Sequence, residues 1–384
     1  MSTTQQTSST VSAPAHYIMV GGFLGSGKTT ALARLAQWLS QRGRRVGLIT
    51  NDQGSHLVDT ATLSARGFAV EEIPGGCFCC RFNSLVEAAQ RLAVSAKPDV
   101  FLAEPVGSCT DLVATVSYPL RKLYGAAFSL APLSVLLDPI RAQRVLGLRD
   151  GPSFSDKVVY IYRKQIEEAD VLVINKCDLI DSGELARLKE MLEAEFGAKR
   201  VFEISARNGR GLEPWFEHIE NATQTPRALM DVDYQVYADG EARLGWFNAT
   251  FRLQASQPVD ANTLIAELSG AIQTGLQAAG AEVAHLKMTL EPRTAIPELA
   301  VINLVRNDFV PELSQRLAEP FLQAELTINL RAEAEPETLR QTVQSAMDQI
   351  FKTRPGLAAE QRHIEAFMPG KPSPTHRVAL PVGS

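Results

Sequence analysis

The feature that most constrains this chain is a glycine-rich loop between a short apolar run and a stretch with helical periodicity. Residues 22–29 read Gly-Phe-Leu-Gly-Ser-Gly-Lys-Thr and match the pattern G-x-x-x-x-G-K-[ST]. Glycines let backbone N–H groups approach phosphate oxygens closely, and the N-terminus of the following helix adds a partial positive charge. The lysine reaches the β- and γ-phosphates, and the next hydroxyl ligates Mg²⁺. The loop therefore predicts a site for a nucleotide triphosphate.

Short apolar runs alternate with amphipathic stretches on both sides of this loop. We expect a helix directly after the loop, further helices at residues 84–95, 157–168 and 182–196, and buried strands at residues 17–20, 45–50, 99–103, 133–137, 171–174 and 201–204. Strands that alternate with helices predict an α/β domain with a mostly parallel sheet that carries this P-loop, placed at residues 16–225. A disordered tail is expected at residues 1–15.

The order of elements changes in the second part of the chain. After a connector near residues 221–240, the pattern predicts strands at 244–253, 282–290, 299–306 and 322–330, and helices at 260–278, 310–317 and 336–351. This order fits a smaller α+β domain of ferredoxin-like type at residues 226–368. Four prolines after residue 368 predict a second disordered tail at residues 369–384.

Composition limits the classes of function. With 45% hydrophobic and 21% charged residues the chain resembles ordinary globular proteins, and 38 Lys+Arg against 43 Asp+Glu give a net charge of −5. This mildly acidic balance argues against nucleic-acid or membrane-surface binding. No segment has the pattern of a membrane span or a signal peptide, so we expect a cytoplasmic protein. Five cysteines in a reducing compartment do not form a disulfide framework.

A second motif indicates which base the nucleotide carries. Asn175, Lys176 and Asp178 follow one predicted strand, and Ser205 and Ala206 follow the next. The Asp178 carboxylate can accept hydrogen bonds from N1–H and the exocyclic amine of guanine, and adenine offers neither in that arrangement. Lys176 can lie over the base, and the backbone after the next strand can reach the guanine oxygen. Alone, the pattern also fits an Asx turn. Together with the phosphate loop it predicts a GTP site.

Carboxylates follow two further predicted strands. Asp52 comes after the strand at 45–50, and Glu104 comes after the strand at 99–103. Ligands bind at such carboxyl ends in open α/β sheets, where a carboxylate can hold Mg²⁺ directly or through water. Gly107 can offer its N–H to the γ-phosphate. A turn residue at Asp52 and a capping carboxylate at Glu104 are the alternative interpretations.

Three of the five cysteines lie within four residues, in the stretch Gly-Gly-Cys-Phe-Cys-Cys-Arg at positions 75–81. Cys77, Cys79 and Cys80 can gather around one ion such as Zn²⁺, Cu⁺ or Co²⁺ at little cost in loop entropy. Three thiolates leave a tetrahedral ion one ligand short, which suits a transient cargo site. Buried apolar cysteines or a redox pair are the alternatives. Cys109 and Cys177 are isolated in the sequence and are expected to be small core or nucleotide-loop residues.

In this order, the phosphate loop, Gly-Gly-Cys-Phe-Cys-Cys, Glu-Pro-Val-Gly and Asn-Lys-Cys-Asp closely resemble the CobW-type GTPases, relatives of the UreG and HypB metallochaperones, over roughly residues 17–217. The resemblance implies a slow, Mg²⁺-dependent GTPase. It further implies binding of Zn²⁺ or Co²⁺ by the C-x-C-C thiolates, and delivery to a client enzyme or a cofactor pathway such as cobalamin biosynthesis. The His-rich segment of many relatives is absent, and Glu104 is followed by Pro-Val-Gly-Ser-Cys in place of the more usual Thr-Thr-Gly.

The resemblance also implies roles for individual residues. Nucleotide binding is assigned to Gly22, Gly25, Ser26, Gly27, Lys28, Thr29, Thr30, Gly107, Asn175, Lys176, Asp178, Ser205 and Ala206. Catalysis is assigned to Lys28, Thr29, Asp52 and Glu104, Mg²⁺ to Thr29 and Asp52, and the transition metal to Cys77, Cys79 and Cys80. The implied partner is a client metalloenzyme or cofactor-assembly protein, with a homodimer left open. Two other functions stay open: a regulatory GTPase that remodels a client and has structural or redox thiols, and a nucleotide-stabilised metal sensor.

Overall fold

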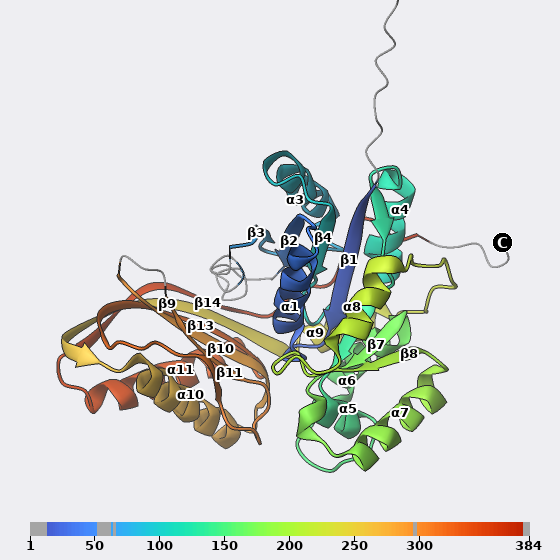
Figure 1. Ribbon diagram of the computed structural model, residues 1–384. Helices are drawn as coiled ribbons and strands as arrows, with labels where there is room; N and C mark the ends of the chain where they lie inside the picture. The colour runs from blue at the N-terminus through green and yellow to red at the C-terminus, as the bar shows by residue number, and fades with distance from the viewer. Residues whose placement is uncertain (1–13, 52–62, 64–66, 295–297, 379–384) are drawn as a thin grey trace, which may run out of the picture.

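The computed structural model describes residues 14–51, 63, 67–294 and 298–378. Two domains lie side by side (Figure 1). Asp52, a predicted Mg²⁺ ligand, and residues 1–13 of the expected N-terminal tail lie outside the described residues. In the part of the chain that is described, no helix combines the length and apolarity needed to cross a membrane.

The first domain is built on a parallel sheet. Its strands lie in the order β3-β2-β4-β1-β6-β7-β8, with β5 paired to β1. Every pairing is parallel, so the carboxyl ends of the strands meet at one edge. The strands are β1 (Ala15–Gly22), β2 (Val46–Asn51), β3 (Ala69–Ile73), β4 (Val100–Glu104), β5 (Phe128–Leu130), β6 (Ser134–Leu137), β7 (Val171–Ile174) and β8 (Arg200–Glu203).

Helices cover both faces of this sheet. Along β1, Ile18 and Val20 belong to one core, and Tyr17 and Met19 belong to the other, as the twofold period of a strand requires. The helices are α1 (Lys28–Gln41), α3 (Phe82–Ser95), α4 (Tyr118–Tyr124), α5 (Pro139–Val145), α6 (Asp156–Glu168), α7 (Ser182–Phe196), α8 (Leu212–Asn221) and α9 (Tyr234–Glu241), with a π-helical turn at Val113–Ser117 and a 3₁₀ turn at Cys177–Leu179. These elements confirm the predicted fold class of the first domain.

The connection between the domains packs against the first domain. Val232 and Tyr237 form a small buried cluster with Ile161, so α9 lies on α6. Asp233 caps α9 by accepting hydrogen bonds from the backbone N–H groups of the first turn. The second domain was expected from residue 226; its first strand, β9, begins at Leu244.

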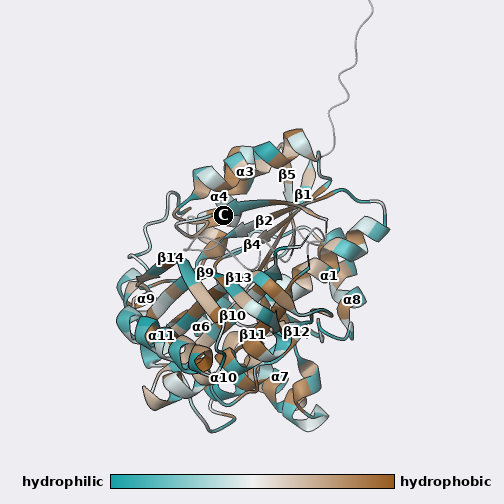
Figure 2. Cartoon of the chain, turned by 90° about the vertical axis from the view of Figure 1, so that its left-hand side faces the viewer, coloured by the Kyte–Doolittle hydropathy of each residue, from teal (hydrophilic) through white to brown (hydrophobic). Residues whose placement is uncertain are grey.

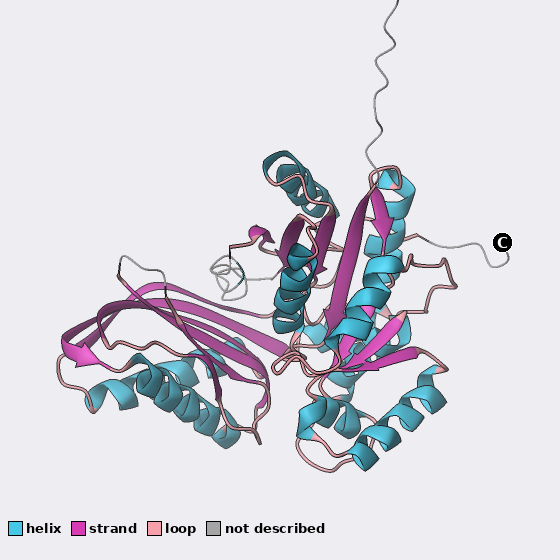
Figure 3. Cartoon of the chain, in the orientation of Figure 1, coloured by secondary structure: helices cyan, strands magenta, loops and turns pink. Residues whose placement is uncertain are grey.

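The second domain is an antiparallel sheet in the order β12-β11-β10-β13-β9-β14, with both helices on one face (Figure 3). Strands β11 and β12 lie between β10 and β13 in the chain; apart from these two, β9, α10, β10, β13, α11 and β14 have the ferredoxin-like order β-α-β-β-α-β. The elements are β9 (Leu244–Val259), α10 (Ala261–Ala278), β10 (Glu282–Pro292), β11 (Ala300–Leu304), β12 (Glu312–Gln315), β13 (Phe321–Glu333), α11 (Pro336–Lys352) and β14 (Leu357–Phe367).

The predicted short helix at residues 310–317 is wrong. The stretch contains β12, in which Leu313 pairs with Ile302 of β11. Pairing with a neighbouring strand thus overrides the local helical pattern. The helices of both domains carry bands of hydrophobic and hydrophilic residues (Figure 2), as expected for helices with one face in the core.

Candidate nucleotide and metal site

The glycine-rich loop joins the carboxyl end of β1 to the N-terminus of α1. Gly27 has a φ of +93°, and a Cβ atom there would lie 2.4 Å from Asn175 Nδ2, so the position excludes any other side chain. Lys28 begins α1, and its Nζ donates a hydrogen bond to Gly22 O at 2.9 Å. The buried Ser26 hydroxyl has no hydrogen-bond partner among the described residues. A loop of this shape, with an ammonium and a hydroxyl turned inward, fits an anionic phosphate chain.

Two of the predicted Mg²⁺-site and catalytic residues lie in direct contact. The hydroxyl of Thr29, in the first turn of α1, donates to Glu104 Oε1 at 3.0 Å. Glu104 ends β4, the strand next to β1. Hydroxyl and carboxylate oxygens are the hard ligands that Mg²⁺ prefers, and the pair therefore fits this ion beside the phosphate loop. Asp52, the third residue of the predicted set, lies outside the described residues.

The predicted base motif is fixed to the phosphate loop. Asn175 Nδ2 donates to Ser26 O at 2.8 Å, and Ala206 N donates to Asn175 Oδ1 at 2.9 Å. Lys176 Nζ donates to Gly25 O at 2.7 Å. One asparagine thus ties together three loops that follow three different strands. Sequence reasoning assigned Asn175 to base recognition, and the contacts add a role in holding the loops in register.

A pocket of about 480 Å³ contains most of the predicted nucleotide residues. Its lining includes Gly25, Gly27, Lys28, Thr29, Thr30, Glu104, Gly107, Asn175, Lys176, Asp178 and Ala206. Of the other predicted residues, Gly22, Ser26 and Ser205 are buried and do not line the pocket. Asp178 is exposed at the rim, where a carboxylate can meet a base.

The opposite wall of the pocket comes from the second domain. Trp246, His285, Lys287 and Arg331 line it, and the Arg331 guanidinium stacks over the Trp246 ring at 3.8 Å. No sequence pattern pointed to these residues, because they are spread over three strands of a domain that carries no recognisable motif.

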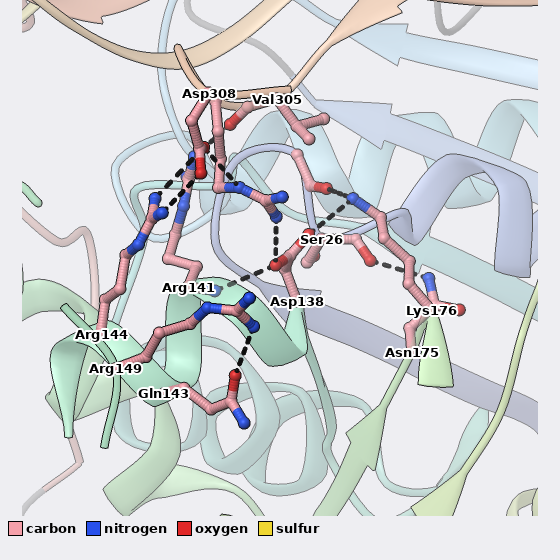
Figure 4. A network of polar contacts seen from close by, with 12 residues as sticks. Ser26, Asp138, Arg141, Gln143, Arg144, Arg149, Asn175, Lys176, Val305 and Asp308 are labelled. Carbon is pink, nitrogen blue, oxygen red and sulfur yellow. Dashed lines mark hydrogen bonds and ion pairs between the residues drawn. The ribbon is translucent and has the colours of Figure 1, made fainter. Parts of the chain in front are cut away.

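A buried ionic network joins this wall to the base motif (Figure 4). Asp138 accepts from Lys176 Nζ at 2.9 Å and from Arg306 Nη1 at 3.0 Å. The Arg141 guanidinium donates to Leu24 O of the phosphate loop and to Val283 O of the second domain, both at 3.1 Å. Burial raises the pKa of Asp138, but the charges of Lys176, Arg306 and Arg141 outweigh this effect and hold the pKa well below its ordinary value.

The three predicted metal-binding thiols lie together. The Sγ atom of Cys77 lies 2.9 Å from that of Cys79 and 3.2 Å from that of Cys80, and the remaining sulfur pair is 3.7 Å apart. Cys77 and Cys79 are buried, and Cys80 is partly exposed. Among the described residues, these cysteines form the one group of three or more His, Cys, Asp or Glu side chains with such mutual proximity. The turn after β3 therefore brings together the side chains of the three cysteines that are close in the sequence.

Cys109 is not isolated in space. It is buried in the same hydrophobic core as Cys77 and Cys79, although it lies 30 residues beyond Cys79 in the sequence. The contacts with Cys109, Cys79 and Cys80 lower the pKa of Cys77 well below the ordinary thiol value, because they stabilise a thiolate there. The contact with Cys77 raises the pKa of Cys80 to about 11. One thiol of the cluster is therefore prepared for ionisation, and its neighbours stay protonated until a cation replaces their protons.

The thiol turn is tied to the nucleotide side of the sheet. Asn51, at the carboxyl end of β2, donates through Nδ2 to Gly76 O at 2.6 Å and to Ile73 O at 2.9 Å. Asn51 also lines the nucleotide pocket. A single buried side chain thus connects the pocket to the residue before Cys77.

The segment at residues 369–378 covers the thiol cluster. Ser373 N donates to Cys80 Sγ at 3.2 Å, and Thr375 N donates to Cys79 O at 2.8 Å. His376 meets the Phe82 ring edge-on at 5.0 Å. The sequence placed these residues in a disordered tail; they instead pack on the first domain, although they form no helix or strand. Their order comes from contacts with distant residues, which a local pattern cannot reveal.

Comparison with known proteins supports the nucleotide-binding geometry. Residues 16–203 match the family described as CobW/HypB/UreG, nucleotide-binding domain. The match lies within the first domain and covers just under half of the chain. The chain is 27% identical to the zinc chaperone CobW of Sinorhizobium sp over 212 residues, which are 50% of this chain and 58% of the relative. It is 31% identical to the zinc chaperone YeiR of Escherichia coli (strain K12) over 163 residues, which are 42% of this chain and 46% of the relative.

These matches span about half the length of the curated relatives. The zinc-regulated GTPase metalloprotein activator 1 of Dictyostelium discoideum is 25% identical over 46% of this chain and 42% of its own length. Among solved structures, HypB from Helicobacter pylori in complex with nickel aligns with a TM-score of 0.40 and 19% identity, over 56% of this chain and 91% of that chain. Zn(II)-bound YjiA GTPase from E. coli aligns with a TM-score of 0.34 and 14% identity, over 88% of this chain and 99% of that chain.

Proposed function

We propose that this protein is a GTP-hydrolysing metallochaperone that takes Zn²⁺ as cargo on Cys77, Cys79 and Cys80 and passes it to a client metalloenzyme. The observation that carries the proposal is the position of the three thiols, gathered within 4.8 Å of one another and joined by Asn51 to the edge of a nucleotide pocket. The names of the relatives point the same way, because several are zinc chaperones and one is a zinc-regulated GTPase.

The nucleotide half of the proposal assigns each contact to a residue in the pocket. Lys28 turns from the Gly22 carbonyl to the β- and γ-phosphates, and Asp178 accepts the two guanine N–H groups. Thr29 and Glu104 would hold Mg²⁺, which would supply positive charge beside the phosphates during hydrolysis. The role of Asp52 as a further Mg²⁺ ligand is part of the same proposal. Hydrolysis is expected to be slow until a partner or cargo completes the site.

In this proposal, two contacts couple the nucleotide pocket to the thiol cluster. Gly107 packs so closely on the phosphate loop that a Cβ there would lie 2.9 Å from Leu24 N. Asn51 holds the Gly76 carbonyl beside Cys77. A γ-phosphate that orders these loops would set the geometry of the thiols, and its loss would loosen the cargo site. By linkage, GTP then tightens metal by the same factor that metal tightens GTP.

The proposal is tested by titrating the reduced protein with Co²⁺ as a spectroscopic probe, first with Mg²⁺-GDP and then with a non-hydrolysable GTP analogue. We expect thiolate-to-metal absorption that is stronger and saturates earlier with the analogue. Cys79→Ser should lose this absorption, whereas Cys177→Ser, a matched change at a buried cysteine outside the cluster, should keep it. Equal metal affinity with both nucleotides would refute gated delivery.

Delivery of Co²⁺ to a cobalamin pathway is a narrower form of the same proposal. Zn²⁺ and Co²⁺ accept the same thiolates and the same tetrahedral geometry, so selectivity depends on availability and client. A competition titration decides between them: displacement of bound Co²⁺ by stoichiometric Zn²⁺ favours zinc as the cargo, and resistance to displacement favours cobalt.

A further inference from the structure

The loop between β11 and β12, residues 305–311, places an aromatic side chain in the wall of the nucleotide pocket. Phe309 lines the same pocket as Lys176 and Asp178 of the base motif. Its side chain is partly exposed, and it packs against the hydrophobic core of the second domain. None of the residues assigned to GTP so far offers the base an aromatic surface, so this ring can add a kind of contact that the site lacks.

One link to the base motif lies on the N-terminal side of Phe309. Arg306 Nη1 donates to Asp138 Oδ1 at 3.0 Å, and the other oxygen of this carboxylate accepts from Lys176 Nζ at 2.9 Å (Figure 4). The Arg306 guanidinium also lies over the Phe309 ring, 5.1 Å from its centre. The ring and Lys176 are therefore connected through only two side chains, both of them buried.

A second link lies on the C-terminal side of Phe309. Glu312, the first residue of β12, pairs with Arg207 at 3.1 Å. Arg207 follows Ala206, whose backbone N–H donates to Asn175 of the base motif. Because Arg207 is exposed, the ion pair adds little stability, but it shows that the two loops meet here. Phe309 thus lies between two links to the loops that are expected to bind guanine.

Contacts within the protein fix the backbone that carries the ring. Gln273 of α10 donates through Nε2 to Asn307 O at 2.8 Å and to Phe309 O at 2.7 Å. The start of the loop packs on the phosphate loop, because a Cβ atom at Gly25 would lie 3.0 Å from Val305 Cγ1. A contact surface that is held in this way costs little entropy when a ligand uses it.

We propose that Phe309 forms the second face of the guanine site, so that the base lies between this ring and the aliphatic part of Lys176 while Asp178 binds its edge. The inference rests on the proposed function, since it adds a contact to the same GTP site. Every base has a π-face, so stacking supplies affinity without selecting the base. A nucleotide bound in this way holds the two domains together through its base, whichever phosphates it carries.

Calorimetric titration of the full chain with Mg²⁺ and three ligands tests the proposal: GDP, inosine diphosphate and inorganic triphosphate. Phe309→Ala should lose affinity for both nucleotides by the same factor, roughly 5- to 150-fold, and should bind inorganic triphosphate as tightly as the wild-type protein. Phe309→Tyr keeps the ring and should keep the affinity. Phe351→Ala is the matched control, because Phe351 is a partly buried phenylalanine of the same domain that does not line the pocket.

Unchanged GDP affinity in Phe309→Ala would overturn the inference, and so would a loss of affinity that is equal for GDP and inorganic triphosphate. Phe309→Leu keeps most of the apolar volume without the aromatic face, and it decides the matter if Phe309→Ala folds poorly. Wild-type GDP affinity in Phe309→Leu would show that the side chain only fills space. These outcomes leave the proposed function intact, whereas failure of the wild-type protein to bind GDP or the GTP analogue would defeat the proposed function itself.

Discussion

At the scale of single residues, Asp178 carries the proposed choice of base. Its carboxylate is exposed at the rim of the pocket, where it can accept two hydrogen bonds from guanine. In Asp178→Asn an amide faces the guanine amine, and the loss of two charge-assisted hydrogen bonds is expected to weaken GTP binding by about 3–6 kcal/mol, roughly 10²–10⁴-fold. Xanthosine triphosphate has a carbonyl in place of that amine and should bind the variant better than GTP. Titration with both nucleotides measures the exchange, and unchanged GTP affinity would count against the assigned role.

Glu168 makes a second prediction at this scale. It is buried at the end of α6, where it accepts from Thr110 Oγ1 at 3.1 Å. Burial, with a smaller contribution from Asp111, raises its pKa from 4.5 to about 8. Because the folded pKa lies above the unfolded one, the folded protein stays protonated while the unfolded chain ionises. Stability is therefore lost as the pH rises from about 4.5 to about 8, at about 1.4 kcal/mol per pKa unit.

Glu168→Gln should remove this pH dependence. We measure the free energy of unfolding of both proteins by urea denaturation. The value for the variant minus that for the wild-type protein should increase between pH 5 and pH 8 and stay constant above pH 9. A constant offset from the amide itself is expected and does not affect the test. If the free energies of unfolding of the two proteins changed with pH in the same way from pH 5 to pH 9, Glu168 would ionise normally in the folded protein.

The sequence predicted those candidate site residues that share a fixed local spacing. The phosphate loop, Asn175 to Asp178 and the three clustered cysteines belong to this class, and the structure brings each set together. Cys109, expected to be a small core or nucleotide-loop residue, is buried in the core of the first domain. Lys287 and Arg331 were missed, since a domain boundary separates them from the phosphate loop.

At the scale of elements, prediction succeeded where the local pattern agreed with the tertiary role. The strand at residues 171–174 and the helix at 182–196 have the predicted bounds. A buried apolar run specifies the strand, and a capping box between Asp181 and Glu184 specifies the start of the helix. Strand β14 was missed because it is an edge strand whose residues are mostly partly or fully exposed and show no clear alternation.

The segment at residues 369–378 gives a prediction at this scale. Deleting the residues after Met368 removes the hydrogen bonds from Ser373 and Thr375 to the thiol turn. Cys80, already partly exposed, should then react several times faster with a disulfide reagent such as dithionitrobenzoate. A protein that ends after Val378 keeps these contacts and serves as the control. Equal reaction rates in the two proteins would show that the segment does not shield the cluster.

At the scale of the whole molecule, the buried network around Asp138 connects the two domains across the nucleotide pocket. Asp138 and Arg306 are each only about 5% exposed or less, and Lys176 completes the group. Asp138→Asn leaves Lys176 without this carboxylate and Arg306 with Asp308 as its remaining acidic partner at 3.2 Å, and the loss of the buried charge is expected to cost about 3–5 kcal/mol of stability. The folded pKa of Asp138 lies below its ordinary value, so its contribution is present at neutral pH and is lost as the pH falls below about 4.

The same substitution tests whether the domains communicate through this network. Asp308→Asn is the comparison variant, because Asp308 pairs with Arg144 across the interface at 2.5 Å and with Arg306 at 3.2 Å but is 40% exposed, so its loss should cost at most about 1 kcal/mol. Asp138→Asn should also weaken GTP binding, since Lys176 loses the carboxylate that positions it beside Gly25. Denaturation at pH 7 and pH 3 with nucleotide titration measures both effects. If the two variants lost stability and GTP affinity to the same extent, the interface would act only as a structural contact. The nucleotide pocket would then not be coupled to the second domain through Asp138.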